Sequence, residues 1–128
     1  MSVYDNIKNK NVITIYQGSD HNEIVHLATP DPDYPKDRTK DRAFDLSGCT
    51  VVSYLDDLDG NRVAEFECEV VEPPTGGDIL RKLPRGITAD LVPDTKVIHV
   101  WGIIITTSDA DQTVLPQIQG GAMVAATV

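Results

Sequence analysis

The stretch that decides the fold runs over residues 44–72 and reads FDLSGCTVVSYLDDLDGNRVAEFECEVVE. Two runs rich in β-branched and aromatic residues flank Asp59-Gly60. An Asp-Gly pair between two such runs indicates a β-hairpin, because glycine accepts a positive φ at no steric cost. We therefore expect a tight turn in which Leu58 pairs with Asn61.

This turn fixes the register of the two strands. Ser53 is expected to face Phe66, and Leu55 to face Ala64. Because successive side chains of a strand point to opposite faces, every second residue after the turn belongs to the core. On the second strand the inward positions are Phe66, Cys68 and Val70, and the outward positions are Glu65, Glu67 and Glu69.

Strand signals of the same kind recur at intervals of roughly ten residues, which is typical of a small all-β sandwich or barrel. Residues 96–106, KVIHVWGIIIT, are apolar at both parities and predict a central strand that is covered on both faces. One short helical turn is expected at residues 86–91. The other expected strands are Asn11–Gln17, Glu23–Ala28, Asp78–Leu83, Gln112–Ile118 and Ala122–Val128, with Gly120-Gly121 as a break or bulge.

The chain has 128 residues, which suits one domain with a single core. We expect residues 1–10 to form a polar N-terminal arm and residues 11–128 to form one sandwich domain. The stretch at residues 29–43 holds three prolines and many charges without an apolar period, so it predicts a long surface loop. Tyr34 is the one large apolar side chain of that loop.

Composition excludes several classes of partner. Twenty Asp and Glu against eleven Lys and Arg give a net charge of −9, which disfavours nucleic acid and anionic membrane surfaces. No apolar run approaches the ~20 residues of a membrane span, and the first residues contain no apolar signal segment.

The chemistry-bearing residues form no catalytic or metal-binding motif. There is no G-x-S-x-G, P-loop or dinucleotide-binding motif. Asp56–Gly60 resembles a calcium loop, but the loop's first and last positions would fall on Leu55 and Phe66, which are not oxygen ligands. We therefore expect no enzyme, no cofactor and no metal. Cys49 and Cys68 are expected to be reduced buried thiols. Neither the histidines (His21, His26 and His99) nor the loop aspartates (Asp31, Asp33 and Asp37) show the spacing of metal ligands.

Aromatic residues leave one binding alternative open. His99 and Trp101 share a strand face and could form a small binding patch with Tyr54 or Tyr16. The simpler interpretation, which we favour, is a half-buried strand face with His and Trp at its rim. A small carbohydrate-binding module using Tyr34, Trp101 or Tyr54 is therefore one alternative function.

Three turns of the chain form a pattern that resembles bacteriophage structural proteins. They are the turn DLSG at residues 45–48, the hairpin around Asp57, Asp59 and Gly60, and the turn at residues 87–91 before Pro93. The pattern is similar to the N-terminal domain of phage baseplate upper proteins and related tail modules. The resemblance spans about residues 11–128 and implies an immunoglobulin-like antiparallel β-sandwich of seven to nine short strands. It implies no catalytic residues.

The expected function is thus that of a non-enzymatic structural protein in the tail, baseplate or tail-fibre apparatus of a phage, with a capsid decoration protein as an alternative. The expected location is the virion, after assembly in the host cytoplasm. The expected partners are other virion proteins, in multiple copies of a symmetric assembly. Contacts are expected in the arm, the loop at 29–43 and the final strand, and the candidate interface residues are Tyr4, Tyr34, Arg38, Arg42, Trp101, Met123 and Val124.

Overall fold

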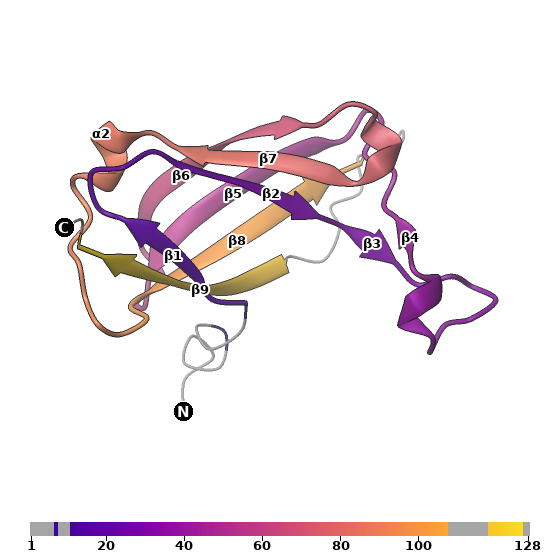
Figure 1. The fold of residues 1–128 in the computed structure, drawn as a ribbon, viewed down its shortest axis with the longest axis horizontal. Helices are drawn as coiled ribbons and strands as arrows, with labels where there is room; N and C mark the ends of the chain where they lie inside the picture. The colour runs from indigo at the N-terminus through magenta and orange to yellow at the C-terminus, as the bar shows by residue number, and fades with distance from the viewer. Residues whose placement is uncertain (1–6, 8–10, 108–117, 127–128) are drawn as a thin grey trace.

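A seven-stranded sheet that rolls onto itself forms the body of the chain (Figure 1). The computed structural model describes residue 7, residues 11–107 and residues 118–126. In chain order the described strands are β1 (Ile13–Tyr16), β2 (His21–His26), β3 (Ala28–Thr29), β4 (Arg42–Ala43), β5 (Thr50–Asp57), β6 (Arg62–Val70), β7 (Asp78–Leu83), β8 (His99–Thr106) and β9 (Ile118–Ala125).

The strand order of the large sheet is β1-β9-β8-β5-β6-β7-β2. Strand β6 pairs with β5 along its first half and with β7 along its second half, so it belongs to both layers of the sandwich. One apolar core fills the space between the layers. It takes Ile79 and Leu83 from β7 and Leu55, Trp101 and Ile103 from β5 and β8. The expected all-β sandwich is confirmed.

The two layers follow the strand orders of an immunoglobulin sandwich. The order β2-β7-β6 corresponds to B-E-D, and β9-β8-β5 corresponds to G-F-C. Strand β1 departs from the expected antiparallel arrangement, because it pairs with β9 in parallel. The turn at residues 17–20 carries the chain from one layer to the other. Strands β1 and β2 are therefore the two end strands of the sheet order, although they are neighbours in the sequence.

The central hairpin has the expected register up to Leu55 but not at its turn. The Asp57 N–H donates to the Asn61 carbonyl at 2.9 Å, so the turn closes on Asp57 and Asn61, and the expected pairing of Leu58 with Asn61 is wrong. Ser53 pairs with Phe66 and Leu55 with Ala64, and a bulge follows Leu55. Phe66 is buried, whereas the outward glutamates of β6 are exposed. Asp57 Oδ1 accepts hydrogen bonds from the backbone N–H groups of Asp59 and Asn61, both at 2.9 Å. The aspartates at this turn therefore stabilise its backbone, as hairpin-turn residues do.

Strand β8 lies in the middle of the sheet between β5 and β9, as its apolar sequence predicts. Its inward side chains join the main core, and Tyr54 covers its outer face at Gly102. A Cβ at Gly102 would lie 2.3 Å from the Tyr54 ring, so only glycine fits under that ring. The Tyr54 ring is in turn covered by the Arg62 guanidinium at 4.2 Å from the ring centroid.

Two expectations for the C-terminal half are wrong. Gly120-Gly121 does not break the chain, because β9 runs through both residues and pairs them with Trp101 and Val100. Glycine opposite Trp101 leaves room for the indole on the same face of the sheet. His99 and Trp101 do not lie at a half-exposed rim, since both side chains are buried.

The helical segments are short. The helix α2 (Arg85–Thr88) overlaps the expected helical turn at residues 86–91 and begins one residue before it, and two 3₁₀ turns lie at Arg38–Lys40 and Pro74–Gly76. No helix in the described part of the chain has the length and apolar character needed to cross a membrane. Most of two expected elements lies outside the described residues. In the expected arm only residue 7 is described, so Tyr4 is outside, and in the expected strand at 112–118 only Ile118 is described.

Glycine substitutions test the Tyr54–Gly102 contact. Gly102→Ala should lower the free energy of unfolding by about 1–3 kcal/mol, because its methyl group would overlap a ring that Arg62 holds in place. Urea unfolding measures the change. Gly86→Ala in α2 is the matched control, since nothing lies within 4 Å of its added methyl group, and it should be neutral or slightly stabilising. Equal effects of the two substitutions would contradict the packing described here.

Candidate assembly interface

Residues 28–43, named here the projecting hairpin, extend away from the sandwich at one end of the molecule (Figure 1). They comprise β3, a 3₁₀ turn at Arg38–Lys40 and β4. Strands β3 and β4 pair only with each other. The stretch predicted as a long loop is therefore a short hairpin with its own hydrogen bonds, and it adds no strand to the large sheet.

The base of the projecting hairpin is held by backbone contacts at Leu27. Its N–H donates to the carbonyl of Gly77 at 2.8 Å, and its carbonyl accepts from the N–H of Phe44 at 2.9 Å. Gly77 has φ +74°, and a Cβ there would lie 2.5 Å from the Leu27 carbonyl oxygen. The turn at residues 73–77 thus requires glycine at its last position, and this position sets where the hairpin leaves the sheet.

Carboxylates organise the far end of the hairpin. Asp31 accepts from the Asp33 N–H at 2.9 Å and from Arg42 Nη2 at 3.0 Å. The Asp33 N–H is the largest influence that lowers the pKa of Asp31, and Arg42 adds to it. Asp37 accepts from the N–H and the hydroxyl of Thr39 and so caps the 3₁₀ turn. These bonds shape the tip and bury Asp31, whereas residues 32–42 stay exposed.

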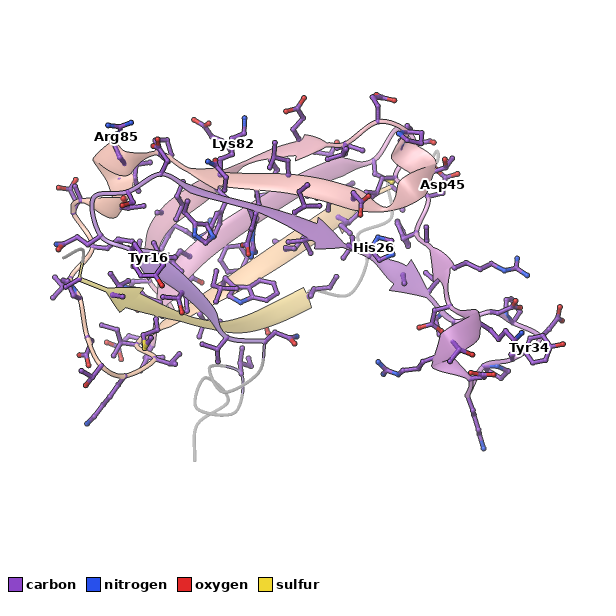
Figure 2. All side chains as sticks on the ribbon, in the orientation of Figure 1. Tyr16, His26, Tyr34, Asp45, Lys82 and Arg85 are labelled. Carbon is purple, nitrogen blue, oxygen red and sulfur yellow. The ribbon has the colours of Figure 1, made fainter. Side chains whose placement is uncertain are left out.

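The tip exposes an aromatic ring among cations. Tyr34 is 53% exposed and lies at the outer end of the hairpin (Figure 2), with Lys40 Nζ 5.4 Å from its ring centroid. Lys36 and Arg38 are also exposed. Residues 29–43 hold four of the eleven Lys and Arg residues and four of the twenty Asp and Glu residues, so the rest of the chain carries the whole net charge of −9.

The structure separates the candidate interface residues into groups. Tyr34, Arg38 and Arg42 lie together on the projecting hairpin and are exposed. Trp101 and Val124 are 4% and 0% exposed, so their placement on a contact surface was wrong. The expectation failed because both residues point into the core, where Trp101 Nε1 donates to the Asn11 carbonyl at 3.0 Å.

Met123 is half-buried on β9, at the opposite end of the molecule from the projecting hairpin. It lines an apolar depression of about 470 Å³ with Pro93, Asp94, Thr95, Ala125 and Ala126. Tyr4 lies outside the described residues. Three of the candidate interface residues are therefore exposed on one element, the projecting hairpin, and Met123 is not on it.

Sequence reasoning missed a buried cation, Arg81, which is 1% exposed between the two layers. Its Cζ lies 4.5 Å from the ring centroids of both Phe66 and Trp101. Its Nε donates to Glu23 at 2.7 Å, its Nη2 donates to the same oxygen, and its Nη1 donates to Ser53 Oγ at 3.2 Å. A signal was present, because the alternation in DILRKL puts Arg81 on the face of Ile79 and Leu83.

The charges in this cluster shift each other's titration. Burial is the largest influence on Glu23 and opposes its ionisation, but His21 and Arg81 together hold its pKa below the ordinary value. Burial lowers the pKa of the Arg81 guanidinium, and Glu23 counteracts part of that change. His21 Nε2 lies 3.3 Å from Glu23 Oε1. The cluster thus balances its own charge inside the sandwich.

A pocket of about 440 Å³ lies where the edge strands β1 and β2 diverge, beside the Arg81 cluster. Its polar groups, Glu23 and Arg81, are bonded to each other. The remaining lining is mostly apolar and is shared by Asn11, Val12, Ile13, Ile24, Val25, His26, Leu27, Trp101 and Ile118.

The remaining candidate groups do not come together as a metal site in the part of the chain that the structure describes. Asp31 and Asp37 are engaged within the projecting hairpin, and His26 Nδ1 lies 2.8 Å from Asp78 Oδ1. Cys49 and Cys68 are free and half-buried rather than fully buried, and burial raises the pKa of the Cys68 thiol.

No family model matches this chain, and no curated protein matches its sequence.

Removing one partner of the Arg81–Glu23 pair should be costly. Arg81→Met and Glu23→Gln should each lower the free energy of unfolding by about 3–5 kcal/mol, because each leaves a charge without its partner between the layers. The double variant should cost clearly less than the sum of the two, since it leaves neither charge. Urea unfolding of all four proteins gives the coupling, and strictly additive effects would show that the pair is not an energetic unit.

His99 should make stability depend on pH. It is buried, its Nδ1 has no hydrogen-bond partner among the described residues, and burial lowers its pKa while Asp57 partly opposes the shift. The unfolded chain therefore takes up a proton on this residue near pH 6.5, and the folded chain only at lower pH. Stability should fall as pH drops below about 6.5, by at most about 1.4 kcal/mol per pH unit.

Urea unfolding at pH 7.5 and pH 5.5 measures this effect. In His99→Leu the decrease between the two pH values should become smaller. His26→Gln, which removes an exposed histidine at the edge of the sheet, should keep the decrease. An unchanged decrease in His99→Leu would rule out His99 as its source.

Proposed function

We propose that this chain is a non-enzymatic assembly module of a bacteriophage particle, in its tail, baseplate or tail-fibre apparatus. The observation that carries the proposal is the projecting hairpin. It is ordered by its own capping and ion-pair contacts, yet its tip residues are exposed and give nothing to the core. Ordering a segment costs conformational entropy, so a tip that buries so little of itself fits a role in contact with another molecule.

The architecture supports the same proposal. The layers β2-β7-β6 and β9-β8-β5 agree with the immunoglobulin-like sandwich that the resemblance to phage tail modules implies. Of the three aromatic residues on which the carbohydrate-binding alternative depends, Trp101 and Tyr54 are buried and offer no ring face on which a sugar could stack, whereas the ring of Tyr34 is exposed.

Amide hydrogen exchange tests the proposal on purified particles. Residues 29–43 should exchange at least about tenfold more slowly in the particle than in the free protein, because the hairpin becomes covered. The turn at Asp57–Asn61, which is shaped by its own hydrogen bonds, is the internal control and should change little. Absence of the protein from the particles, or equal exchange in both states, would overturn the proposal.

The position of the module is a separate question with its own readout. Electron micrographs of particles that lack the protein should show a missing part of the tail. Intact tails with unstable heads would instead assign the chain to capsid decoration.

A further inference from the structure

The pocket between β1 and β2 has two large, exposed apolar side chains among its lining residues. Strands β1 and β2 are the end strands of the sheet order, and the pocket of about 440 Å³ lies where they diverge (Figure 1). Val12, which precedes β1, is 48% exposed, and Ile24 on β2 is 64% exposed. Exposed apolar side chains that gather around a concave site indicate a surface that another molecule covers.

The inner part of the pocket is held in place by buried groups. Trp101 is 4% exposed, and its Nε1 donates to the Asn11 carbonyl at 3.0 Å. The Arg81 guanidinium lies 4.5 Å from the Trp101 ring centroid and donates to both Glu23 and Ser53. A site whose lining is already positioned loses little conformational entropy when a ligand enters it.

Glu23 is the inward-facing polar group that a ligand in this pocket could reach. Its side chain is 24% exposed, whereas that of Arg81 is 1% exposed. Oε1 of Glu23 accepts both hydrogen bonds from Arg81 and lies 3.3 Å from His21 Nε2. Oε2 accepts no hydrogen bond from the residues that the structure describes. Because an ionised carboxylate accepts on both oxygens, the pocket offers an acceptor at Oε2.

The charge of this cluster favours an uncharged ligand. Arg81 already balances the charge of Glu23, so an ammonium group at Oε2 would also be repelled by the buried guanidinium. A ligand carboxylate would lie against Glu23 itself, and Arg81 is too deeply buried to compensate it. A hydroxyl group donates to Oε2 without adding a charge, and the remainder of the ligand would contact the mostly apolar lining.

We propose that the pocket between β1 and β2 binds a small apolar alcohol. Its hydroxyl group would donate to Glu23 Oε2, and its apolar body would lie among Trp101, Val25 and Ile118. The pocket volume of about 440 Å³ is within the range of roughly 300–1,000 Å³ that is typical of small-molecule sites. The proposal goes beyond the assembly role and does not depend on it.

Three probes of similar shape test the ligand class: benzyl alcohol, benzylamine and benzoate, which differ in the charge at one end. Backbone amide signals in NMR spectra of the full chain report where and how tightly each probe binds. Benzyl alcohol should shift the signals of residues 11–13 and 23–27 saturably. It should bind more tightly than benzylamine and at least about tenfold more tightly than benzoate, because the anion would lie against a carboxylate.

Val12→Trp tests the location, because the larger side chain would occupy space that the ligand needs. It should weaken the binding of benzyl alcohol at least about tenfold, since the indole and the ligand exclude each other. Val63→Trp is the matched control, because Val63 is 41% exposed on β6 and does not line the pocket. The control should bind benzyl alcohol as wild type does. Both variants should fold, as circular dichroism would show, because both positions are exposed.

Glu23→Gln tests the acceptor while it keeps the shape of the pocket. The preference for benzyl alcohol over benzoate should fall at least about threefold, because the amide is uncharged and can itself donate. If this variant does not fold, the two tryptophan variants still decide the location. The proposal would be overturned by the absence of a saturable shift with benzyl alcohol, by tighter binding of benzylamine or benzoate, or by equal weakening in Val12→Trp and Val63→Trp.

Discussion

The structure depends on one buried interaction, the stacking of the Arg81 guanidinium between Phe66 and Trp101 with Glu23 as its counter-charge. Arg81 is on β7 and Trp101 on β8, so the cation bridges the two layers directly. A domain of this size has few core residues. A cation at one of these interior positions requires that neighbouring groups accept hydrogen bonds from it and balance its charge. Glu23 and Ser53 accept hydrogen bonds from it, and the rings of Phe66 and Trp101 contribute to its burial.

The same cluster determines how the edge of the sheet behaves. Glu23 is a charged residue that points inward from the edge strand β2, and a foreign strand that paired along this edge would bury its partly exposed carboxylate further. Inward charges are one means by which sheets resist edge-to-edge association.

Local signals were sufficient for the body of the fold but not for its long-range features. Asp59-Gly60 and the alternation after it gave the correct hairpin register up to Leu55, because the position of the turn and side-chain parity are both local. The parallel pairing of β1 with β9 joins residues more than a hundred positions apart, and nothing in either strand encodes the direction of the other. The continuity of β9 through Gly120-Gly121 likewise involves a distant strand, because these glycines pair with Trp101 and Val100 of β8.

The candidate interface residues also differ in whether local sequence predicts their exposure. Tyr34, Arg38 and Arg42 were identified from a polar, proline-rich stretch, and such a composition is enough to predict exposure. Trp101 and Val124 were misplaced because an aromatic or apolar residue in a strand has the same sequence signature on either face.

What no composition could indicate is that the long stretch would be ordered. That order comes from specific pairs, Asp31 with Arg42 and Asp37 with Thr39, whose partners are chosen by the backbone path. A preorganised tip loses little further entropy on docking, so even a few weak contacts retain most of their free energy. A flexible loop of the same composition would lose more entropy on docking. The hydrogen bonds and the ion pair inside the hairpin thus allow a small, exposed surface to serve as a contact.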